Sequence, residues 1–231
     1  MPSFDFGALG AEHTGWLIGG LWLSLRLAAI VFVLSLPLAA GIALLRLSPS
    51  RALRAAGWGY VEAVRNVPLL VHLLFWYFGA PELLPELWRE RLYADVDVEV
   101  GSAVIALTLY TAAYMSEDMR SGIRAVPAAQ FQAARALGLG YLAAMRWVVL
   151  PQALRVTVPP LISQTLNLWK DTSVATVIGV AELMYQAARV EAASFRSVEA
   201  FAFATAAYLA VSIAITALAA WHHRRHPVRT R

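Results

Sequence analysis

Five apolar blocks, separated by polar segments, organise the 231-residue chain. The blocks cover residues 16–45, 60–79, 101–119, 158–184 and 200–221. Each block is close to or longer than the ~20 residues that an α-helix needs to cross a bilayer. The pattern therefore predicts an all-α integral membrane protein with about five transmembrane helices. Pro37 and Gly41 are expected to bend the first helix, and Pro68 is expected to kink the second.

The density of arginine alternates from one side of these blocks to the other. Segment 46–59 is expected to form a polar hinge; it carries three arginines and no acid, and the segments after the third and fifth blocks are also rich in arginine. Segment 81–99 instead carries six acidic residues and two arginines. Because cytoplasmic flanks collect Lys and Arg, the N-terminus is expected outside and the C-terminus in the cytoplasm. Asp5 and Glu12 precede the first block without any Lys or Arg, and the block is too long for the apolar region of a signal peptide, so we interpret it as a retained span.

Composition supports a surface that meets lipid. The chain is 59% hydrophobic and only 15% charged, whereas a soluble domain carries roughly 25% charged residues. The net charge of +4 comes from arginines placed between the apolar blocks, which favours membrane topology over nucleic-acid binding. The chain has no cysteine, which excludes disulfides and thiolate metal sites. His72 has no acid or histidine at ligand spacing, so we predict a packed or hydrogen-bonded histidine and no metal site.

A segment without carboxylates, residues 130–160, lies between two apolar blocks. Pro127 is expected at the first position of a helix, Gly138 and Gly140 interrupt the pattern, and Pro151 is expected to end a second helix that starts at Tyr141. We predict two short helices joined at a glycine elbow outside the hydrocarbon. Their apolar residues are expected to face a partner or the membrane interface: Phe131, Leu137, Leu142, Met145 and Trp147.

The third block carries a polar and aromatic stripe. Tyr110, Tyr114 and Glu117 are spaced i, i+4 and i+7, which places them on one face of a helix, with Thr111 and Asp118 beside them. If this face lines the interior of the bundle, it can contact a small zwitterion. If it lies at the interface, Tyr114 and Glu117 belong to an aromatic belt and a helix end.

The fourth block contains the chain's only lysine, Lys170, next to Asp171 and close to Asn167 and Glu182. An ionisable side chain near the bilayer centre costs about 2.5–3.5 kcal/mol on insertion scales. Adjacent residues point in different directions from a helix, so Lys170 and Asp171 are poorly placed to pair with each other. They either belong to a polar pathway or lie near the cytoplasmic end, where Lys snorkels and Asp caps a helix.

Motifs of soluble enzymes are absent. The only lysine follows Leu-Asn-Leu-Trp, so the chain has no GxxxxGK[ST] phosphate cradle. If transport is driven by ATP, another chain must hydrolyse it, and no cofactor is expected here. A short helix in the 128–151 loop would then be the natural docking element, since helix-in-groove contacts are a common recognition mode.

The same loop resembles the cytoplasmic EAA loop of ABC-importer membrane subunits. The resemblance is carried by Ala133 and Ala134, by Gly138, and by Leu150 and Pro151. Phe131 and Gln132 precede these residues. The family usually has Glu where this chain has Gln132, which retains hydrogen bonding and loses the negative charge.

Further segments, in the same order along the chain, look like those of polar amino-acid permeases. They are RNVPLLV at 65–71, FWYFG at 75–79, AAYMSEDMRSGI at 112–123, LPQALR at 150–155 and WKDTSVATVIGVAEL at 169–183. The resemblance implies one permease domain over residues 1–231, with an ABC type I importer-like bundle and a cytoplasmic coupling loop at 120–157. It also implies a multi-pass protein of the bacterial cytoplasmic membrane that imports polar amino acids, such as glutamate, aspartate, glutamine or basic amino acids.

The partners implied by the resemblance are a cytoplasmic ABC ATPase dimer, which would hold ATP and Mg, an extracytoplasmic solute-binding protein, and a second copy or homologue of the permease. The coupling loop would transmit motions of the ATPases to the bundle. Candidates for the substrate pathway are drawn from the polar residues of the third and fourth blocks: Tyr110, Tyr114, Glu117, Asn167, Lys170 and Asp171.

Two other classes of protein are compatible with parts of the pattern. A membrane receptor or scaffold would also lack a phosphate cradle, but the ordered motifs along the chain do not fit it. An ion-coupled secondary carrier is expected to show paired halves and broken helices. Five helices are also few for a self-contained carrier.

Overall fold

The structure, a computed structural model, describes residues 10–95 and 97–225. Asp5 and residues 226–231, which contributed to the predicted orientation, lie outside the described residues. The described part of the chain is helical and contains no strand, which confirms the predicted all-α class. The main helices are α1 (Gly10–Leu47), α2 (Arg51–Arg65), α3 (Leu69–Leu74), α4 (Glu86–Asp95), α5 (Val98–Arg124), α6 (Ala128–Ala136), α7 (Tyr141–Ala144), α8 (Leu150–Asp171), α9 (Leu183–Ser194) and α10 (Ser197–Arg225).

The five predicted blocks correspond to α1, the α2–α3 pair, α5, α8 and α10. Within the described residues, three helical stretches are long and apolar enough to cross a membrane on their own: Gly10–Leu47, Val98–Arg124 and Ser197–Trp221. The second block is broken into shorter helices, and α8 has 22 residues but carries several polar ones. The helix α1 continues through Pro37 and Gly41.

The break in the second block lies between Asn66 and Pro68. Proline has no N–H to donate and disfavours helical conformation in the preceding residue, so α2 ends and α3 begins afresh. His72 lies across the break, with Nε2 3.0 Å from the carbonyl oxygen of Val64. This contact confirms the prediction of a hydrogen-bonded histidine. The predicted polar hinge at 46–59 is mostly wrong, because α2 starts at Arg51 and only a short turn separates it from α1.

The first and third spans form the centre of the bundle. Leu27 and Val31 of α1 pack against Ala103, Ala106 and Leu107 of α5, and all of them are buried. Small residues at such a contact let two helix backbones approach closely, which is how membrane helices gain packing energy without a hydrophobic effect between them. The helix α8 lies against α5 and α10, and these contacts hold its polar residues beside α5.

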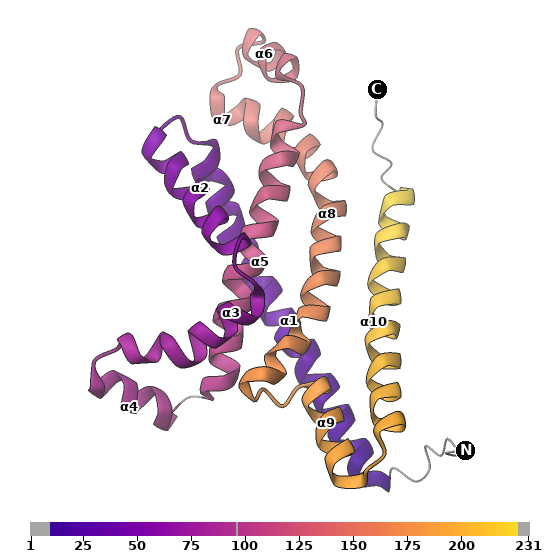
Figure 1. Cartoon of the computed structure of the whole chain (residues 1–231). Helices are drawn as coiled ribbons and strands as arrows, with labels where there is room; N and C mark the ends of the chain where they lie inside the picture. Colours follow the sequence, from indigo (N-terminus) through magenta and orange to yellow (C-terminus); the bar gives the residue numbers. More distant parts are fainter. Residues whose placement is uncertain (1–9, 96, 226–231) are drawn as a thin grey trace.

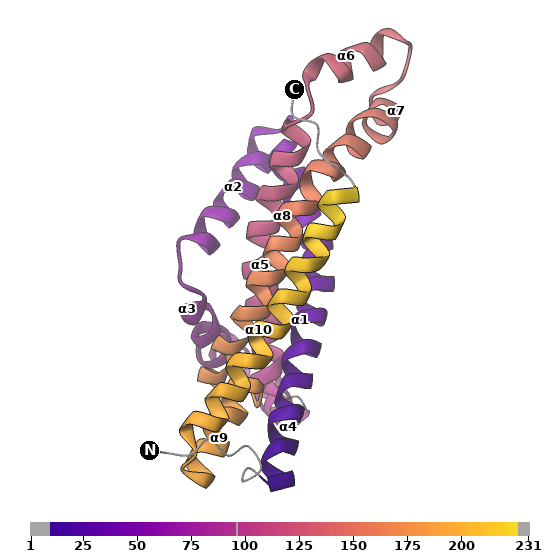
Figure 2. The same cartoon turned by 90° about the vertical axis from the view of Figure 1, so that its right-hand side faces the viewer.

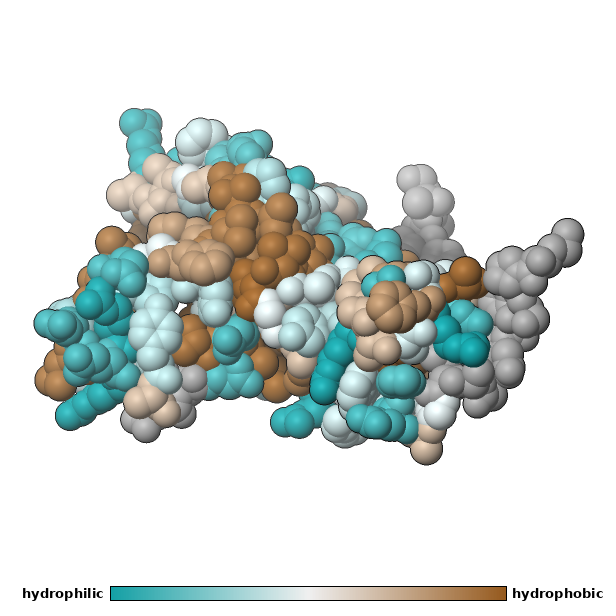
Figure 3. Space-filling model, turned by 60° about the horizontal axis from the view of Figure 1, so that its bottom comes forward, coloured by the Kyte–Doolittle hydropathy of each residue, from teal (hydrophilic) through white to brown (hydrophobic). Residues whose placement is uncertain are grey.

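The helices give the molecule two distinct ends. The carboxyl ends of α5 and α10 lie at the same end as α6 and α7, while α4 and α9 lie at the other end (Figures 1 and 2). The α6–α7 end collects the arginine-rich segments, so it is the predicted cytoplasmic end. Seen toward the α4 and α9 end, brown apolar residues remain on the surface between hydrophilic groups (Figure 3). Only 6% of the most apolar stretch of α10 is buried within the chain, which suits a helix facing lipid or a partner.

Candidate functional site

A polar cavity of about 400 Å³ lies between α5 and α8. The residues that line it come from one face of each helix: Tyr110, Thr111, Tyr114, Gln164, Asn167, Leu168, Lys170 and Asp171. On both helices these positions recur every three or four residues, which is the spacing of one helical face. Five of the six predicted pathway residues therefore line one cavity: Tyr110, Tyr114, Asn167, Lys170 and Asp171.

The tyrosine side of the cavity is fixed by several contacts. The hydroxyl oxygens of Tyr110 and Tyr114 are 3.3 Å apart, and their ring centroids are 5.0 Å apart. The Arg65 guanidinium, from the end of α2, lies 4.8 Å from the centroid of the Tyr114 ring. Such a cation–π contact holds the Tyr114 ring in place, and either tyrosine hydroxyl can be the donor between the two. His72 packs edge-on against Tyr110, with centroids 5.9 Å apart.

On the opposite side, the amide of Gln164 anchors α8 to α5. Its Nε2 donates a 3.0 Å hydrogen bond to Asp118 Oδ2. Gln164 lines the cavity but was not among the predicted pathway residues, although it precedes Asn167 and Leu168 by one helical turn. That spacing is the signal by which it could have been found.

Lys170 and Asp171 lie at the end of α8 that is remote from α6 and α7. Because Lys170 follows Leu150 by 20 residues of helix, it lies about 30 Å along the axis from the start of α8. Asp171 lines the same cavity as Tyr110, which is near the middle of α5. The alternative that placed the charged pair near the cytoplasmic end is therefore wrong. No ion pair within 4.0 Å joins the two in the described part of the chain, and Lys170 is exposed at the cavity.

Glu117 does not line the cavity. Its carboxylate forms ion pairs with Arg46 at the end of α1 and with Arg120 one turn further along α5, the latter at 2.7 Å. The two guanidinium groups hold the carboxylate close to the cytoplasmic ends of the helices. Glu117 thus joins α1 to α5, and its predicted place beside the tyrosines is wrong.

The fourth block does not form one helix to its predicted end at 184. After α8, Thr172–Ile178 is a 3-10 helix, and Gly179 takes a left-handed conformation with φ +87° before α9 starts. Glu182 then caps α9 by accepting a 2.9 Å hydrogen bond from the Tyr185 N–H. An αL glycine and a capping carboxylate are common chain-reversal signals.

The loop between α5 and α8 contains the two short helices predicted from its glycines. At the end of α6, the N–H of Gly138 donates to the Arg135 carbonyl at 3.0 Å and the N–H of Leu139 donates to the Ala134 carbonyl at 3.2 Å. These are the two hydrogen bonds of a Schellman motif, and Gly138, with φ +87°, supplies its left-handed residue. Gly140 has φ −63° and needs no glycine-specific conformation.

Two predictions about the prolines of this loop differ from the structure. Pro127 lies one residue before α6 and not at its first position. Pro151 does not end the second helix, because a π-helical turn, Met145–Val149, joins α7 directly to α8 and Pro151 falls in the first turn of α8. Pro151 has no N–H to donate, and it follows the π-helical turn closely, where the α-helical pattern of hydrogen bonds is already interrupted.

Side chains of the loop differ widely in exposure. Leu137 is 85% exposed and Leu142 is 79% exposed, whereas Phe131 is half-buried against Tyr141, with ring centroids 5.6 Å apart. Phe131 therefore stabilises the elbow instead of standing free as predicted. The predicted loop residues divide into an exposed set, Gln132, Ala133, Gly138, Leu150 and Pro151, and the buried Ala134.

Comparisons with known proteins match most of the chain. Residues 21–226 match the family described as "Binding-protein-dependent transport system inner membrane component". The glutamate/aspartate import permease protein GltJ of Escherichia coli K12 is 35% identical over 203 residues, which are 87% of this chain and 82% of that protein. The probable glutamine ABC transporter permease protein GlnM of Bacillus subtilis 168 is 33% identical over 205 residues, 89% of this chain and 90% of its own. A crystal structure of an amino acid ABC transporter with histidines matches 96% of this chain and 99% of its own, at 29% identity and a TM-score of 0.84.

Proposed function

The chain belongs to the family of binding-protein-dependent transport system inner membrane components and is a permease subunit of an amino-acid ABC importer; we propose that the cavity between α5 and α8 is part of its substrate pathway. One observation carries this proposal. Lys170 and Asp171, of opposite charge, line a single cavity together with two tyrosine hydroxyls, level with the middle of α5.

This arrangement suits a zwitterionic amino acid. Lys170 can donate charge-assisted hydrogen bonds to the substrate α-carboxylate, and Asp171 can accept them from its α-ammonium group. Tyr110 and Tyr114 supply hydroxyls that both donate and accept, which fits a polar side chain. The relatives named for glutamate, aspartate and glutamine favour polar amino acids as the cargo class.

The exposed side of the cavity indicates a second permease. Asn167 and Lys170 are exposed on the single chain, and a lysine facing hydrocarbon at this depth would cost about 2.5–3.5 kcal/mol. A second copy of this chain, or a homologous permease, would cover the cavity and enclose an aqueous path. Pairing thus removes the energetic problem that the single chain presents to the bilayer.

The α6–α7 loop is proposed to dock on a cytoplasmic ABC ATPase dimer, which would bind ATP and Mg and hydrolyse ATP. Leu137 and Leu142 offer exposed apolar contacts, and the Gly138 elbow fixes the angle between the short helices. Gln132 is exposed on α6 and would contribute hydrogen bonds instead of charge. The π-helical turn connects this loop without interruption to α8, so that a movement of the loop acts on the helix that carries Lys170.

At the other end of the bundle, an extracytoplasmic solute-binding protein would deliver the amino acid near α4 and α9. The segment from Pro81 to Glu99 supplies a helix, α4, and most of the acidic residues on that side. The membrane would be the bacterial cytoplasmic (inner) membrane. Alternating access of the paired permeases, driven by closure of the ATPases, would move substrate past the cavity.

Uptake into proteoliposomes tests the proposed function. The chain is reconstituted with its co-purified ATPase and binding protein, and labelled polar amino acids are offered with ATP inside and no ion gradient. We expect uptake that requires ATP and stops when the ATPase is inhibited. Uptake that follows an imposed proton or sodium gradient without ATP would instead identify a secondary carrier.

A further inference from the structure

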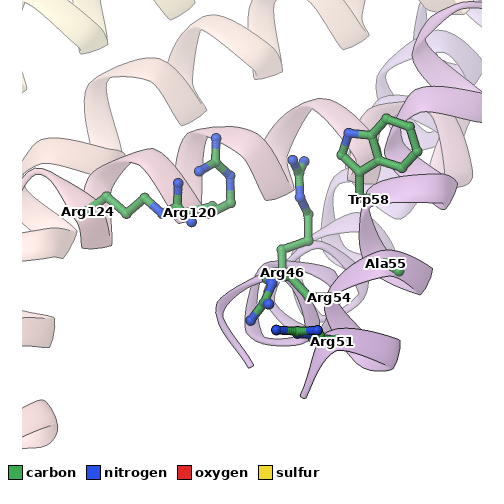
Figure 4. A pocket seen from close by; sticks show the side chains of 7 residues that line it. All are labelled: Arg46, Arg51, Arg54, Ala55, Trp58, Arg120 and Arg124. Carbon is green, nitrogen blue, oxygen red and sulfur yellow. The ribbon is translucent and has the colours of Figure 1, made fainter. Parts of the chain in front are cut away.

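A second cavity, of about 520 Å³, lies at the cytoplasmic end and is separate from the proposed substrate pathway. Figure 4 shows the residues around it, which arise from the end of α1, from α2 and from the end of α5. They are five arginines, an alanine and a tryptophan: Arg46, Arg51, Arg54, Ala55, Trp58, Arg120 and Arg124. None of the acidic residues that the structure describes lines it. We propose that this cavity binds the phosphate headgroup of an anionic phospholipid of the cytoplasmic leaflet.

The positive charge of the cavity is only partly neutralised. Glu117 pairs with Arg46 and Arg120, and it is the only carboxylate among the described residues to form an ion pair with any of the five arginines. Arg51 and Arg124 are exposed and have no ion pair within the described residues. Glu62, the acid on α2, interacts electrostatically with Arg46, but its carboxylate accepts a hydrogen bond from Asn66. Guanidinium groups therefore outnumber the carboxylates that face them.

The walls of the cavity are held in place by packing. Gly57 is buried where α2 crosses the end of α1, and a Cβ at this position would lie 2.8 Å from Arg46 Cγ. This close approach fixes α2 against α1. Arg54 donates a 2.9 Å hydrogen bond from Nη1 to the Ser48 carbonyl in the turn between the two helices. The arginines thus project from helices that are packed against each other and held by hydrogen bonds.

The chemistry of arginine favours phosphate. The planar guanidinium presents a fork of N–H donors that matches two oxygens of one phosphate group, and several arginines around one cavity can share it. Basic pockets between membrane helices on the cytoplasmic side are general sites for anionic lipid headgroups. Free phosphate offers the same chemistry but lacks the acyl chains.

The surroundings favour a lipid over a soluble anion or a protein. Trp58, which lines the cavity, is 56% exposed and provides apolar surface beside the arginines for glycerol and acyl chains. Tryptophan is typical of the membrane–water interface. In Figure 2, α2 lies apart from α6 and α7, which project beyond the ends of the other helices. The proposed ATPase contact and the cavity are therefore on different parts of the cytoplasmic end.

Native mass spectrometry of the full chain released from nanodiscs tests the assignment. The probes are phosphatidylglycerol, phosphatidylethanolamine and inorganic phosphate. We expect wild type to retain phosphatidylglycerol in preference to phosphatidylethanolamine, and the double variant Arg51→Gln/Arg124→Gln to lose this retention by on the order of tenfold, because two of the charged contacts near the lipid surface are removed. The matched control Arg155→Gln/Arg224→Gln removes the same charge from exposed sites elsewhere at this end and is expected to retain the lipid.

Four results would overturn the proposal. Equal retention of the two lipids by wild type would show no headgroup site, and an equal loss in the control variant would show a general charge effect. Stabilisation by inorganic phosphate without retention of phosphatidylglycerol would identify a soluble anion as the ligand. Unchanged lipid retention together with loss of the ATPase in the Arg51→Gln/Arg124→Gln variant would make this corner a protein-docking surface. None of these readouts depends on amino-acid uptake, so failure here is distinct from failure of the proposed pathway.

Discussion

The hydroxyl of Tyr208 on α10 donates a hydrogen bond of 2.8 Å to Glu182 Oε2, in the turn before α9. Glu182 is fully buried and also accepts from Ser24 Oγ at 3.0 Å and Thr176 Oγ1 at 2.5 Å. Within the described residues no cation forms an ion pair with it. A buried carboxyl group without a counter-ion is tolerated only when hydrogen bonds replace its hydration. Glu182 therefore joins α1, α9, α10 and the segment after α8.

Replacing Tyr208 with Phe is expected to lower the free energy of unfolding by about 1–3 kcal/mol, because one lone pair of a buried carboxyl group loses its donor. Thermal unfolding of the purified chain in detergent measures the effect. Tyr185→Phe is the matched control, since the Tyr185 ring is 37% exposed and its residue contacts Glu182 through the backbone N–H. If both variants melt at the wild-type temperature, Glu182 does not depend on Tyr208.

The close crossing of α5 and α8 supplies a second test. A Cβ at Gly122 would overlap Thr157 Oγ1 and lie 3.2 Å from the Ala153 carbonyl oxygen. Gly122→Ala is expected to force the helices apart and to cost about 1–3 kcal/mol by overpacking. Adding Thr157→Ala removes the overlapping Oγ1 and is expected to restore part of the stability. Gly41→Ala, in open space on α1, should change little, and an equal loss there would attribute the effect to any glycine substitution.

Much of the fold was predictable because the length of an apolar stretch decides whether a helix can span the membrane. The five apolar blocks were found from this length alone. Charge alternation then oriented them. What the pattern missed are features decided by local polar contacts. The fourth block reads as apolar to residue 184, but Gly179 and the capping Glu182 reverse the chain first. The segment before Tyr60 reads as a hinge, yet an amphipathic helix needs no long apolar run to form.

Most of the residues that line the candidate site were predictable from the sequence, but their arrangement in space was not. Helical spacing correctly grouped Tyr110 with Tyr114 in the cavity. The same spacing also added Glu117, which does not line the cavity because its carboxylate pairs with Arg46 and Arg120. Spacing on one helix cannot show which cations a second helix presents. The pairing of α5 with α8, which brings Lys170 level with Tyr110, is a tertiary contact that no local pattern encodes.

The cavity proposal predicts a graded response at Lys170. Lys170→Met is expected to lower the uptake rate at limiting substrate by about tenfold or more, since a charge-assisted contact of about 1.5–3 kcal/mol with the carboxylate is lost. Lys170→Arg retains the positive charge and is expected to keep a larger share of the activity. ATP-driven uptake into proteoliposomes, normalised to assembled complex, measures both. Wild-type uptake by Lys170→Met would remove this residue from the pathway.

The two glycines at the elbow of the loop differ in backbone conformation. Gly138 has φ +87° and Gly140 has φ −63°, so an alanine at 138 must adopt a left-handed conformation at a cost of about 1–2 kcal/mol, while an alanine at 140 carries no such strain. Gly138→Ala is therefore expected to weaken ATPase co-purification and ATP-driven uptake, and Gly140→Ala to leave both near wild type. Gly138→Asn should fall between them, since Asn tolerates this conformation. Equal effects at 138 and 140 would contradict the importance of the elbow angle.

Docking of the ATPase is best tested at Leu137, because this side chain is 85% exposed and its loss leaves the loop intact. Phe131→Asp would also remove the packing of Phe131 on Tyr141, so loss of binding in that variant would not distinguish contact from collapse of the elbow. Leu137→Asp is expected to abolish co-purification of the ATPase while the chain still inserts and melts like wild type, since a charge buried in an apolar interface is strongly disfavoured. Leu83→Asp is a change of the same chemistry at a 78% exposed leucine just before α4, the helix at the opposite end of the bundle in Figure 1, and it is expected to retain the ATPase. Co-purification that survives Leu137→Asp, with crosslinks to the ATPase found outside 125–149, would place the contact on another surface of the cytoplasmic end.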